Sequence, residues 1–297
     1  MATPLRFDRT LEFEYGAVAP MTPLIRRVIA RNGGAFTFHG TGTYIVGRGE
    51  VAIIDAGPLL DEHIEALQRA VAGETVTHLI MTHTHRDHSP AGAPLKLLTG
   101  AKTYGFGPHG GEREDEAVEE GADHNFSPDL RVRHGDMIEG HGWTLEAVHT
   151  PGHTSNHLCF ALREENALFC GDHVMGWSTT VVSPPDGDMR AYRASLAALL
   201  AREEAIYWPT HGAPVRDPKI HVAGLLEHRA EREAQILACL ADGLSTIPEI
   251  VRRLYKDVDP RLHGAAGRSV LAHLIELVDR GAVHADPVPT IGALFRR

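Results

Sequence analysis

The stretch that decides the fold is THTHRDHSPAG, residues 82–92, in which three histidines and an aspartate crowd between His83 and His88. It directly follows the apolar run VTHLIM, residues 76–81, which predicts a short buried strand. His83 and His85 alternate, so they cannot share a helix face, but they can converge from a loop at a strand end. Imidazole and carboxylate groups are typical zinc ligands, and catalytic sites keep one position open for water. The pattern therefore favours a metal site over a polar loop of pH-sensitive histidines.

Further candidate ligands follow other short apolar runs. HTPGHTSNH, residues 149–157, offers His153 in a glycine-rich turn. FCGDHV, residues 169–174, offers Asp172, and WPTHG, residues 208–212, offers His211. Each lies beside a glycine, as an exposed turn at a strand end would. Because the alternation of strands and helices indicates α/β layering, these turns can meet at one edge of a sheet.

The series THTHRDH, TPGHT, CGDH and PTHG, in this order, resembles the metallo-β-lactamase fold superfamily over roughly residues 40–215. The resemblance implies an α/β fold, a four-layer αββα sandwich with its metal site at one edge of two facing sheets. Antibiotic-hydrolysing members often carry a cysteine ligand where this chain has Asp172. An aspartate there is the pattern of glyoxalase II-like, lactonase-like and nuclease-like members.

The resemblance also implies two divalent metal ions, with zinc as the first choice and iron or manganese as alternatives, since histidine and carboxylate ligands suit all three. Asp172 would bridge the two ions, and Asp55 would support a ligand histidine, with a simple turn cap as the alternative for Asp55. The implied ligands are His83, His85 and His153 for one ion and Asp87, His88 and His211 for the other.

A second unit is expected over residues 223–297, after a catalytic domain over residues 1–222. A helix is predicted over residues 225–240, and Thr246 with Glu249 forms a capping box that opens a second helix. A third amphipathic helix ends at Gly281, before the short strand AVHAD. This outline resembles the winged-helix-like C-terminal region of the lactamase-beta-2-like subgroup, which includes an endonuclease of single-stranded RNA. We expect the tail to pack beside the metal site or on a second subunit, and a homo-oligomer is left open.

Two loops are expected near the site. Residues 176–192 follow Asp172 and should overhang the metals, so Ser178, Thr179 and Tyr192 are candidate substrate contacts. Residues 106–129 are acidic and glycine-rich, which predicts a surface loop or mobile flap. Four further histidines are assigned to solvated loops: His109, His124, His134 and His141.

Composition limits the function classes. The 297 residues carry a net charge of −10, and residues 225–297 hold equal numbers of acidic and basic side chains, so the excess lies in residues 1–224. An acidic main domain argues against a broad nucleic-acid surface. Three cysteines without a CxxC spacing make no disulfide framework, so Cys159 and Cys170 are expected in the core and the cytoplasm is the expected compartment. The chain shows no apolar run of membrane-spanning length and no secretory signal, so no membrane partner is expected.

The predicted chemistry is metal-assisted hydrolysis. A hydroxide bridging two ions would attack an acyl carbon or a phosphorus, because bound cations lower the pKa of water from 15.7 to roughly 7. Asp87 would orient the nucleophile and pass a proton to the leaving group. Three interpretations stay open: a hydrolase of a small-molecule ester, thioester or lactone, which the acidic domain favours; a phosphodiesterase or single-stranded RNA endonuclease; and a nucleic-acid-binding regulator whose metal domain senses a ligand.

Overall fold

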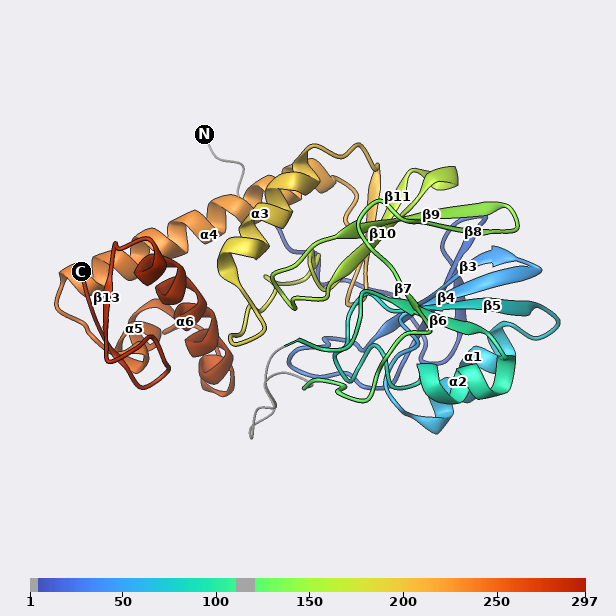
Figure 1. Ribbon diagram of the computed structural model, residues 1–297, viewed down its shortest axis with the longest axis horizontal. Helices are drawn as coiled ribbons and strands as arrows, with labels where there is room; N and C mark the ends of the chain where they lie inside the picture. The colour runs from blue at the N-terminus through green and yellow to red at the C-terminus, as the bar shows by residue number, and fades with distance from the viewer. Residues whose placement is uncertain (1–4, 111–120) are drawn as a thin grey trace.

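The computed structural model describes residues 5–110 and 121–297. Two β-sheets face each other in the larger part of the molecule (Figure 1). The first sheet has the order β1-β2-β3-β4-β5-β6-β7. Its strands are Val18–Pro20, Ile25–Ile29, Gly42–Arg48, Glu50–Ile54, Thr75–Ile80, Lys102–Gly105 and Leu130–Arg131. The second has the order β12-β11-β10-β9-β8. In chain order its strands β8 to β12 are Met137–Gly140, Trp143–His149, Leu158–Leu162, Ala167–Gly171 and Ile206–Pro209.

Helices cover the outer face of each sheet, which completes the expected four layers. Helices α1 (Asp61–Ala70) and α2 (Gly92–Thr99) lie on the first sheet, and α3 (Met189–Leu200) and the start of α4 (Pro218–Ala241) lie on the second (Figure 1). The αββα prediction is therefore confirmed.

Strand β10 shows why the layers hold together. Its alternate side chains Leu158, Phe160 and Leu162 enter the core between the sheets, whereas Cys159 and Ala161 enter the core beneath α3 and α4. Successive strand residues point to opposite faces, so an uninterrupted apolar strand fits a sheet that is covered on both sides. Cys170 lies in the same outer core, and both cysteines are free thiols, as the sequence predicted.

The C-terminal unit is carried by α4. It adds α5 (Ile247–Leu254), α6 (His263–Asp279) and the two-stranded sheet of β13 (His284–Asp286) and β14 (Leu294–Arg296). The capping box of Thr246 and Glu249 opens α5, and the apolar faces of the helices share one core with Phe295. Short 3₁₀ turns lie at Arg163–Glu165 and Pro260–Leu262.

Two details of this unit differ from the expectation. Helix α4 begins at Pro218 and not near residue 225, because a proline in the first turn has no amide hydrogen to lose and its fixed φ suits a helix start. The expected domain boundary at residue 222 thus falls inside α4, and it stays a prediction. Strand β14, the partner of β13, was not assigned from the sequence.

Among the described residues, no helix is both long enough and apolar enough to cross a membrane.

The expected flap over residues 106–129 is only partly described, and residues 111–120 lie outside the described residues. The part that follows is paired with the histidine-bearing loop. Arg86 N donates to Gly121 O, Asp123 N donates to Thr84 O, and His85 forms a β-bridge with Ala122. Residues 121–123 therefore brace the loop that carries the predicted ligands.

The inter-sheet core should dominate the stability of the sandwich. Phe160 is fully buried there, so Phe160→Ala should lower the free energy of unfolding by about 3–5 kcal/mol, the usual cost of a large cavity. Leu97→Ala is the control, because Leu97 is exposed, and it should change stability by less than about 0.5 kcal/mol. Urea unfolding measures both. Equal effects of the two substitutions would contradict the two-sheet core.

Candidate metal centre

The predicted ligands all follow strand ends at one edge of the two sheets. The loop after β5 carries His83, His85, Asp87 and His88, and the turn after β9 carries His153. Asp172 directly follows β11, and His211 lies two residues beyond β12. Strands β4, β5 and β6 run parallel, as do β11 and β12, so their carboxyl ends meet at the same edge. Seven side chains from four separate segments of the chain are thereby brought together.

The first of two groups is made of imidazoles. His83 Nε2 and His153 Nε2 each lie 3.1 Å from His85 Nδ1. In the second group, the Oδ2 of Asp87 lies 3.3 Å from His88 Nε2 and 3.1 Å from His211 Nε2. Every ligand-type atom of a group lies within 4.8 Å of the others, a spacing that one metal ion can span.

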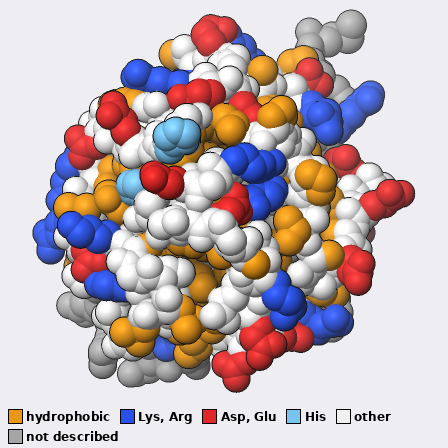
Figure 2. Space-filling view, turned by 90° about the vertical axis from the view of Figure 1, so that its right-hand side faces the viewer, with side chains coloured by type: hydrophobic (Ala, Val, Ile, Leu, Met, Phe, Trp, Pro, Cys, Tyr) orange, Lys and Arg blue, Asp and Glu red, His pale blue; other side chains and the backbone are white. Residues whose placement is uncertain are grey.

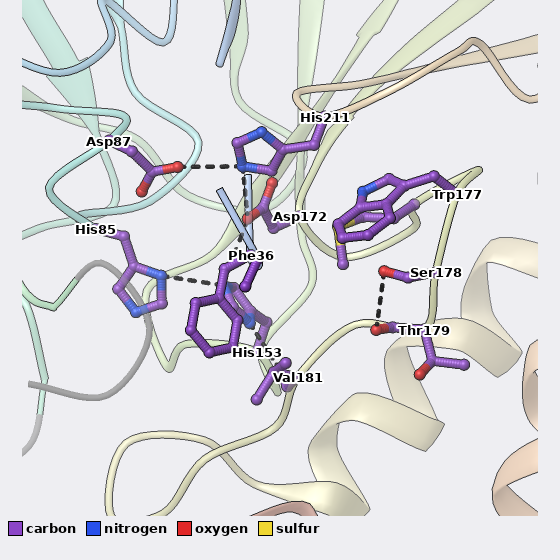
Figure 3. Close-up of a pocket in the computed structure, with 12 residues that line it drawn as sticks. Phe36, His85, Asp87, His153, Asp172, Trp177, Ser178, Thr179, Val181 and His211 are labelled. Atoms are coloured by element: carbon purple, nitrogen blue, oxygen red, sulfur yellow. Dashed lines mark hydrogen bonds and ion pairs between the residues drawn. The ribbon is translucent and has the colours of Figure 1, made fainter. Parts of the chain in front are cut away.

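Asp172 lies between the two groups. Its Oδ2 is 3.4 Å from His211 Nε2 and 3.9 Å from His153 Nε2 (Figure 3). The same oxygen is 3.4 Å from His88 Nε2. The backbone that holds it is fixed in turn, since Asp172 N donates to His157 Nε2. One carboxylate can therefore reach both groups.

The ring nitrogens that face away from the centre have hydrogen-bond partners. His153 Nδ1 lies 2.8 Å from Val181 O, His211 Nδ1 lies 3.2 Å from Gly40 O, and His88 Nδ1 lies 2.9 Å from Asp55 Oδ2. With a metal bound, these acceptors favour the proton on Nδ1, which leaves the Nε2 lone pair free to face the metal. Such outer partners are the usual way in which a protein orients metal-binding histidines.

Asp55 ties the two sheets together beneath the centre. Besides His88, its carboxylate accepts hydrogen bonds from Thr82 N and Thr82 Oγ1, both at 2.8 Å, and from Thr210 Oγ1 at 3.0 Å. Asp55 directly follows β4 and has a left-handed conformation with φ 53°. It thus connects the loops after β5 and β12, which carry ligands of the second group.

The electrostatics of the site are those of a cation site. Burial, together with neighbouring histidine charges, holds the pKa of His83 and His85 well below the usual range, so these rings are neutral lone-pair donors. Burial alone would raise the pKa of Asp172, but the charges of His211 and His88 outweigh it, and the carboxyl stays ionised. Burial opposes protonation of His211 too, yet Asp172 and Asp87 raise its pKa to about 10.

Two buried atoms test whether a metal fits. Within the described part of the chain, Asp172 Oδ1 has no hydrogen-bond partner, and His88 Nε2 forms no hydrogen bond although it lies 3.3 Å and 3.4 Å from the Asp87 and Asp172 carboxylates. Leaving a buried polar atom unsatisfied costs about 1–3 kcal/mol, and more for a charged one. Unsatisfied ligand atoms, neutral imidazoles and ionised carboxylates on one buried centre are a donor set that a divalent cation fits.

Substrate would reach the centre through a pocket with an apolar wall. Ala35, Phe36, Met175, Trp177 and Val181 line it together with Ser178 and Thr179 (Figure 3). Trp177 is held in place by stacking on Phe38, with 4.6 Å between ring centroids. Ser178 and Thr179 line this pocket beside the ligand-type residues, and their contact with substrate stays a prediction.

Tyr192, expected from the sequence to contact substrate, is instead fully buried. Its hydroxyl donates to His173 O, and its backbone packs so tightly on Gly152 that a Cβ added at Gly152 would lie 2.2 Å from Tyr192 Cα. Gly152 also has φ 140°, which a side chain would strain, so the turn before His153 requires glycine.

Some residues of the site were not found from the sequence. Phe36 and Trp177 were missed, although Trp177 lies in the segment expected to overhang, and Phe36 lies in the glycine-flanked loop NGGAFTFHG. His109, expected in a solvated loop, has a largely buried side chain whose Nδ1 lies 3.0 Å from Thr84 Oγ1. The sequence does place a glycine close to both Phe36 and Trp177, and this was the pattern that could have identified them as pocket residues.

The chain belongs to the metallo-β-lactamase superfamily, whose family model matches residues 37–211. A second model, the beta-lactamase associated winged helix domain, matches residues 246–287. Both resemblances drawn from the motifs are therefore confirmed, and the protein is a metal-dependent hydrolase.

Three similar proteins illustrate the relationship. An atrochrysone carboxyl ACP thioesterase of Pseudocercospora fijiensis is 30% identical over 80% of this chain and 69% of its own length. The lactamase-like protein adaB of Aspergillus niger is 31% identical over 84% of this chain and 78% of its own. The crystal structure of a beta-lactamase domain protein from Burkholderia ambifaria matches with a TM-score of 0.81 and 18% identity, covering 99% of this chain and 97% of that one.

The role of Asp55 can be tested without a substrate. Asp55→Asn keeps the size of the side chain but replaces one carboxylate oxygen with a donor that cannot accept from Thr82, Thr210 or His88. We expect metal affinity to fall about 10- to 100-fold, as is typical when the partner of a ligand histidine is lost. Chelator competition measures it, with the exposed Glu62→Gln as control. An affinity equal to that of the control would show that Asp55 does not orient His88.

Proposed function

We propose that the protein is a dinuclear metal-dependent hydrolase of acyl thioesters. The observation that carries the proposal is the position of the Asp172 carboxylate between two three-residue groups of ligand-type side chains. His83, His85 and His153 would hold one ion, Asp87, His88 and His211 the other, and Asp172 both. Zinc is the first candidate, and iron and manganese accept the same donor set.

When bound, divalent ions in such a site supply a nucleophile from water near neutral pH and polarise the carbonyl group under attack. The chain's own residues do the remaining work. Asp87 has its Oδ2 turned to His88, His211 and Thr41 Oγ1, which leaves Oδ1 as the atom that accepts a proton from the attacking water. The apolar wall of Phe36, Trp177 and Val181 excludes bulk water from the acyl group.

The leaving group supports a thioester. A thiolate, with a pKa near the value of about 8.5 for cysteine, departs without a strong acid beside it, whereas an alkoxide requires one. The charges of His88 and His211, which outweigh burial, hold the pKa of the Asp87 carboxyl well below its usual range, so this ionised group offers no proton to a leaving group. The thioesterase names of relatives that are 30–33% identical to this chain over 65–72% of their own length point the same way.

The face of the molecule in Figure 2 and the net charge of the C-terminal residues give the nucleic-acid alternatives no support. On the end of the sandwich that lies away from the C-terminal unit, acidic, basic and hydrophobic side chains are interspersed (Figure 2). A phosphate backbone is bound by basic side chains gathered on one face, and that gathering is not seen on this face. The C-terminal residues 225–297 carry no net charge.

The number of metal ions is the first test. Purified protein saturated with zinc should hold two equivalents per chain. Asp172→Ala should weaken both, because this carboxylate reaches both groups, whereas His88→Ala should weaken mainly one. Metal analysis after dialysis against graded chelator separates the cases. Saturation of the wild type at one equivalent would contradict the dinuclear centre.

The substrate class is tested by a panel of an acyl-CoA, an acyl-pantetheine thioester, a lactone, bis-p-nitrophenyl phosphate and labelled single-stranded RNA. We expect kcat/KM for the thioesters to exceed that for the phosphodiesters at least tenfold, with Asp172→Ala as the inactive control. Preferential cleavage of RNA or of the phosphodiester would replace the thioester proposal with the nuclease alternative.

A further inference from the structure

A buried arginine of the C-terminal helix α4 contacts the loop that follows Asp172. Arg229 is only 3% exposed, and its Nη2 donates to the carbonyl oxygen of Thr180. Its guanidinium also lies over the ring of Tyr192, 5.2 Å from the ring centroid. Within residues 5–110 and 121–297, no carboxylate forms an ion pair with it. A buried cation without a carboxylate partner is costly, so its position requires an explanation beyond packing.

Thr180 links Arg229 to the candidate metal centre through hydrogen bonds. Its side-chain hydroxyl, also buried, lies 2.7 Å from Asp172 O and 3.2 Å from His173 O, and donates toward these carbonyls. The same residue therefore accepts from Arg229 through its carbonyl and holds the backbone of Asp172 through its hydroxyl. Only one residue separates the arginine from the carboxylate placed between the two ligand groups.

A second route converges on the same backbone. The ring of Tyr192 lies beneath Arg229 and 4.8 Å from the His173 ring, and its hydroxyl donates to His173 O at 3.1 Å. Arg229 thus contacts two residues, Thr180 and Tyr192, and each of them hydrogen-bonds residues 172–173. This arrangement accounts for the burial of Tyr192, which the sequence had suggested as a substrate contact.

Helix α4 is itself fixed to both parts of the molecule. Arg193 of α3 pairs with Glu233 of α4 at 2.9 Å and with Glu276 of α6 at 3.2 Å, and Arg280 pairs with Glu233 at 2.8 Å. His273 lies close enough to these two glutamates to suggest a further metal group. Arg193 and Arg280 already balance the negative charge of these glutamates. We therefore interpret the cluster as a set of ion pairs that fixes the position of α4.

We propose that Arg229 is a positioning residue of the metal centre: from the C-terminal unit it fixes Thr180 and Tyr192, and through them Asp172, so that one carboxylate reaches both ligand groups. The proposal rests on the metal-binding role of Asp172 given above. In this proposal the C-terminal unit helps to position the metal ligands and is not an independent module.

The chain provides a matched control one turn along the same helix. Arg232 also donates to a backbone carbonyl, that of Leu254, and lies over a tyrosine ring, that of Tyr255, but it faces the C-terminal unit. Arg229→Met and Arg232→Met therefore remove the same chemistry from α4, and only the first removes the link to Thr180.

The experiment measures zinc affinity of the metal-free protein by chelator competition, together with thermal stability and, on the best thioester, kcat and KM. We expect Arg229→Met to lose at least tenfold in metal affinity and to lower kcat more than it raises KM, with a melting temperature like that of Arg232→Met. Arg232→Met should keep wild-type affinity. Arg229→Met with affinity and kcat within twofold of Arg232→Met would overturn the proposal.

A second variant covers the case in which Arg229→Met does not fold. Thr180→Val keeps the shape of the side chain and removes the hydroxyl, so it should show the same loss of metal affinity. Where both single variants fold, the double variant should lose little more than the larger single loss, because the two residues act in one chain of contacts. Wild-type affinity in Thr180→Val would overturn the proposal.

Metal affinity is read without any substrate. Its dependence on Arg229 can therefore be decided even if thioesters prove not to be the substrate, and a failure of the thioester panel would leave this result unchanged.

Discussion

The site depends on the burial of two carboxylates, Asp87 and Asp172, beside one another at the edge of the sandwich. Both are less than a tenth exposed, and both have an oxygen within 3.4 Å of His211 Nε2. Ionised groups leave water only when opposite charge is supplied, so this pair requires cations. Protons on His88 and His211 supply that charge where no metal is bound, which is why the pKa of each ring is raised. Metal binding then replaces those protons.

The rest of the fold keeps this costly arrangement in place. Two sheets buried on both faces give rigid strand ends, and Asp55, Thr82 and Thr210 connect the loops that leave them. The overhanging loop is held from the other side by Thr180, Tyr192 and Arg229. In this account the C-terminal unit contributes to the centre through α4. A chain ending near residue 222 would lose Arg229, so it should bind metal more weakly than the full chain.

The ligand-type residues could be located from the sequence because each follows an apolar run, and His153, Asp172 and His211 also lie beside a glycine. Strand ends of an α/β sandwich meet at one edge, so the pattern of runs and turns is enough to predict that these positions converge. The direction in which a side chain points could not be predicted from this pattern. Tyr192 lies in the first turn of a helix whose inward face is set by contact with Gly152 and Arg229, and nothing local to residues 176–192 reveals that contact.

Residues whose role depends on distant packing were missed for the same reason. Arg229 lies in a helix rich in charged residues, where a lone arginine is normally solvated. Phe36 and Trp177 resemble core residues, because an aromatic side chain that lines a pocket has the same sequence signature as one that fills a core. The early start of α4 was missed because hydrophobic periodicity marks the middle of a helix better than its end.

The most direct test of the account is anomalous X-ray diffraction from crystals of the zinc-loaded protein, recorded on both sides of the zinc absorption edge. The account predicts two anomalous peaks per chain, one among His83, His85 and His153 and one among Asp87, His88 and His211, with the Asp172 carboxylate contacting both. A single peak, or two peaks of which Asp172 contacts only one, would contradict it.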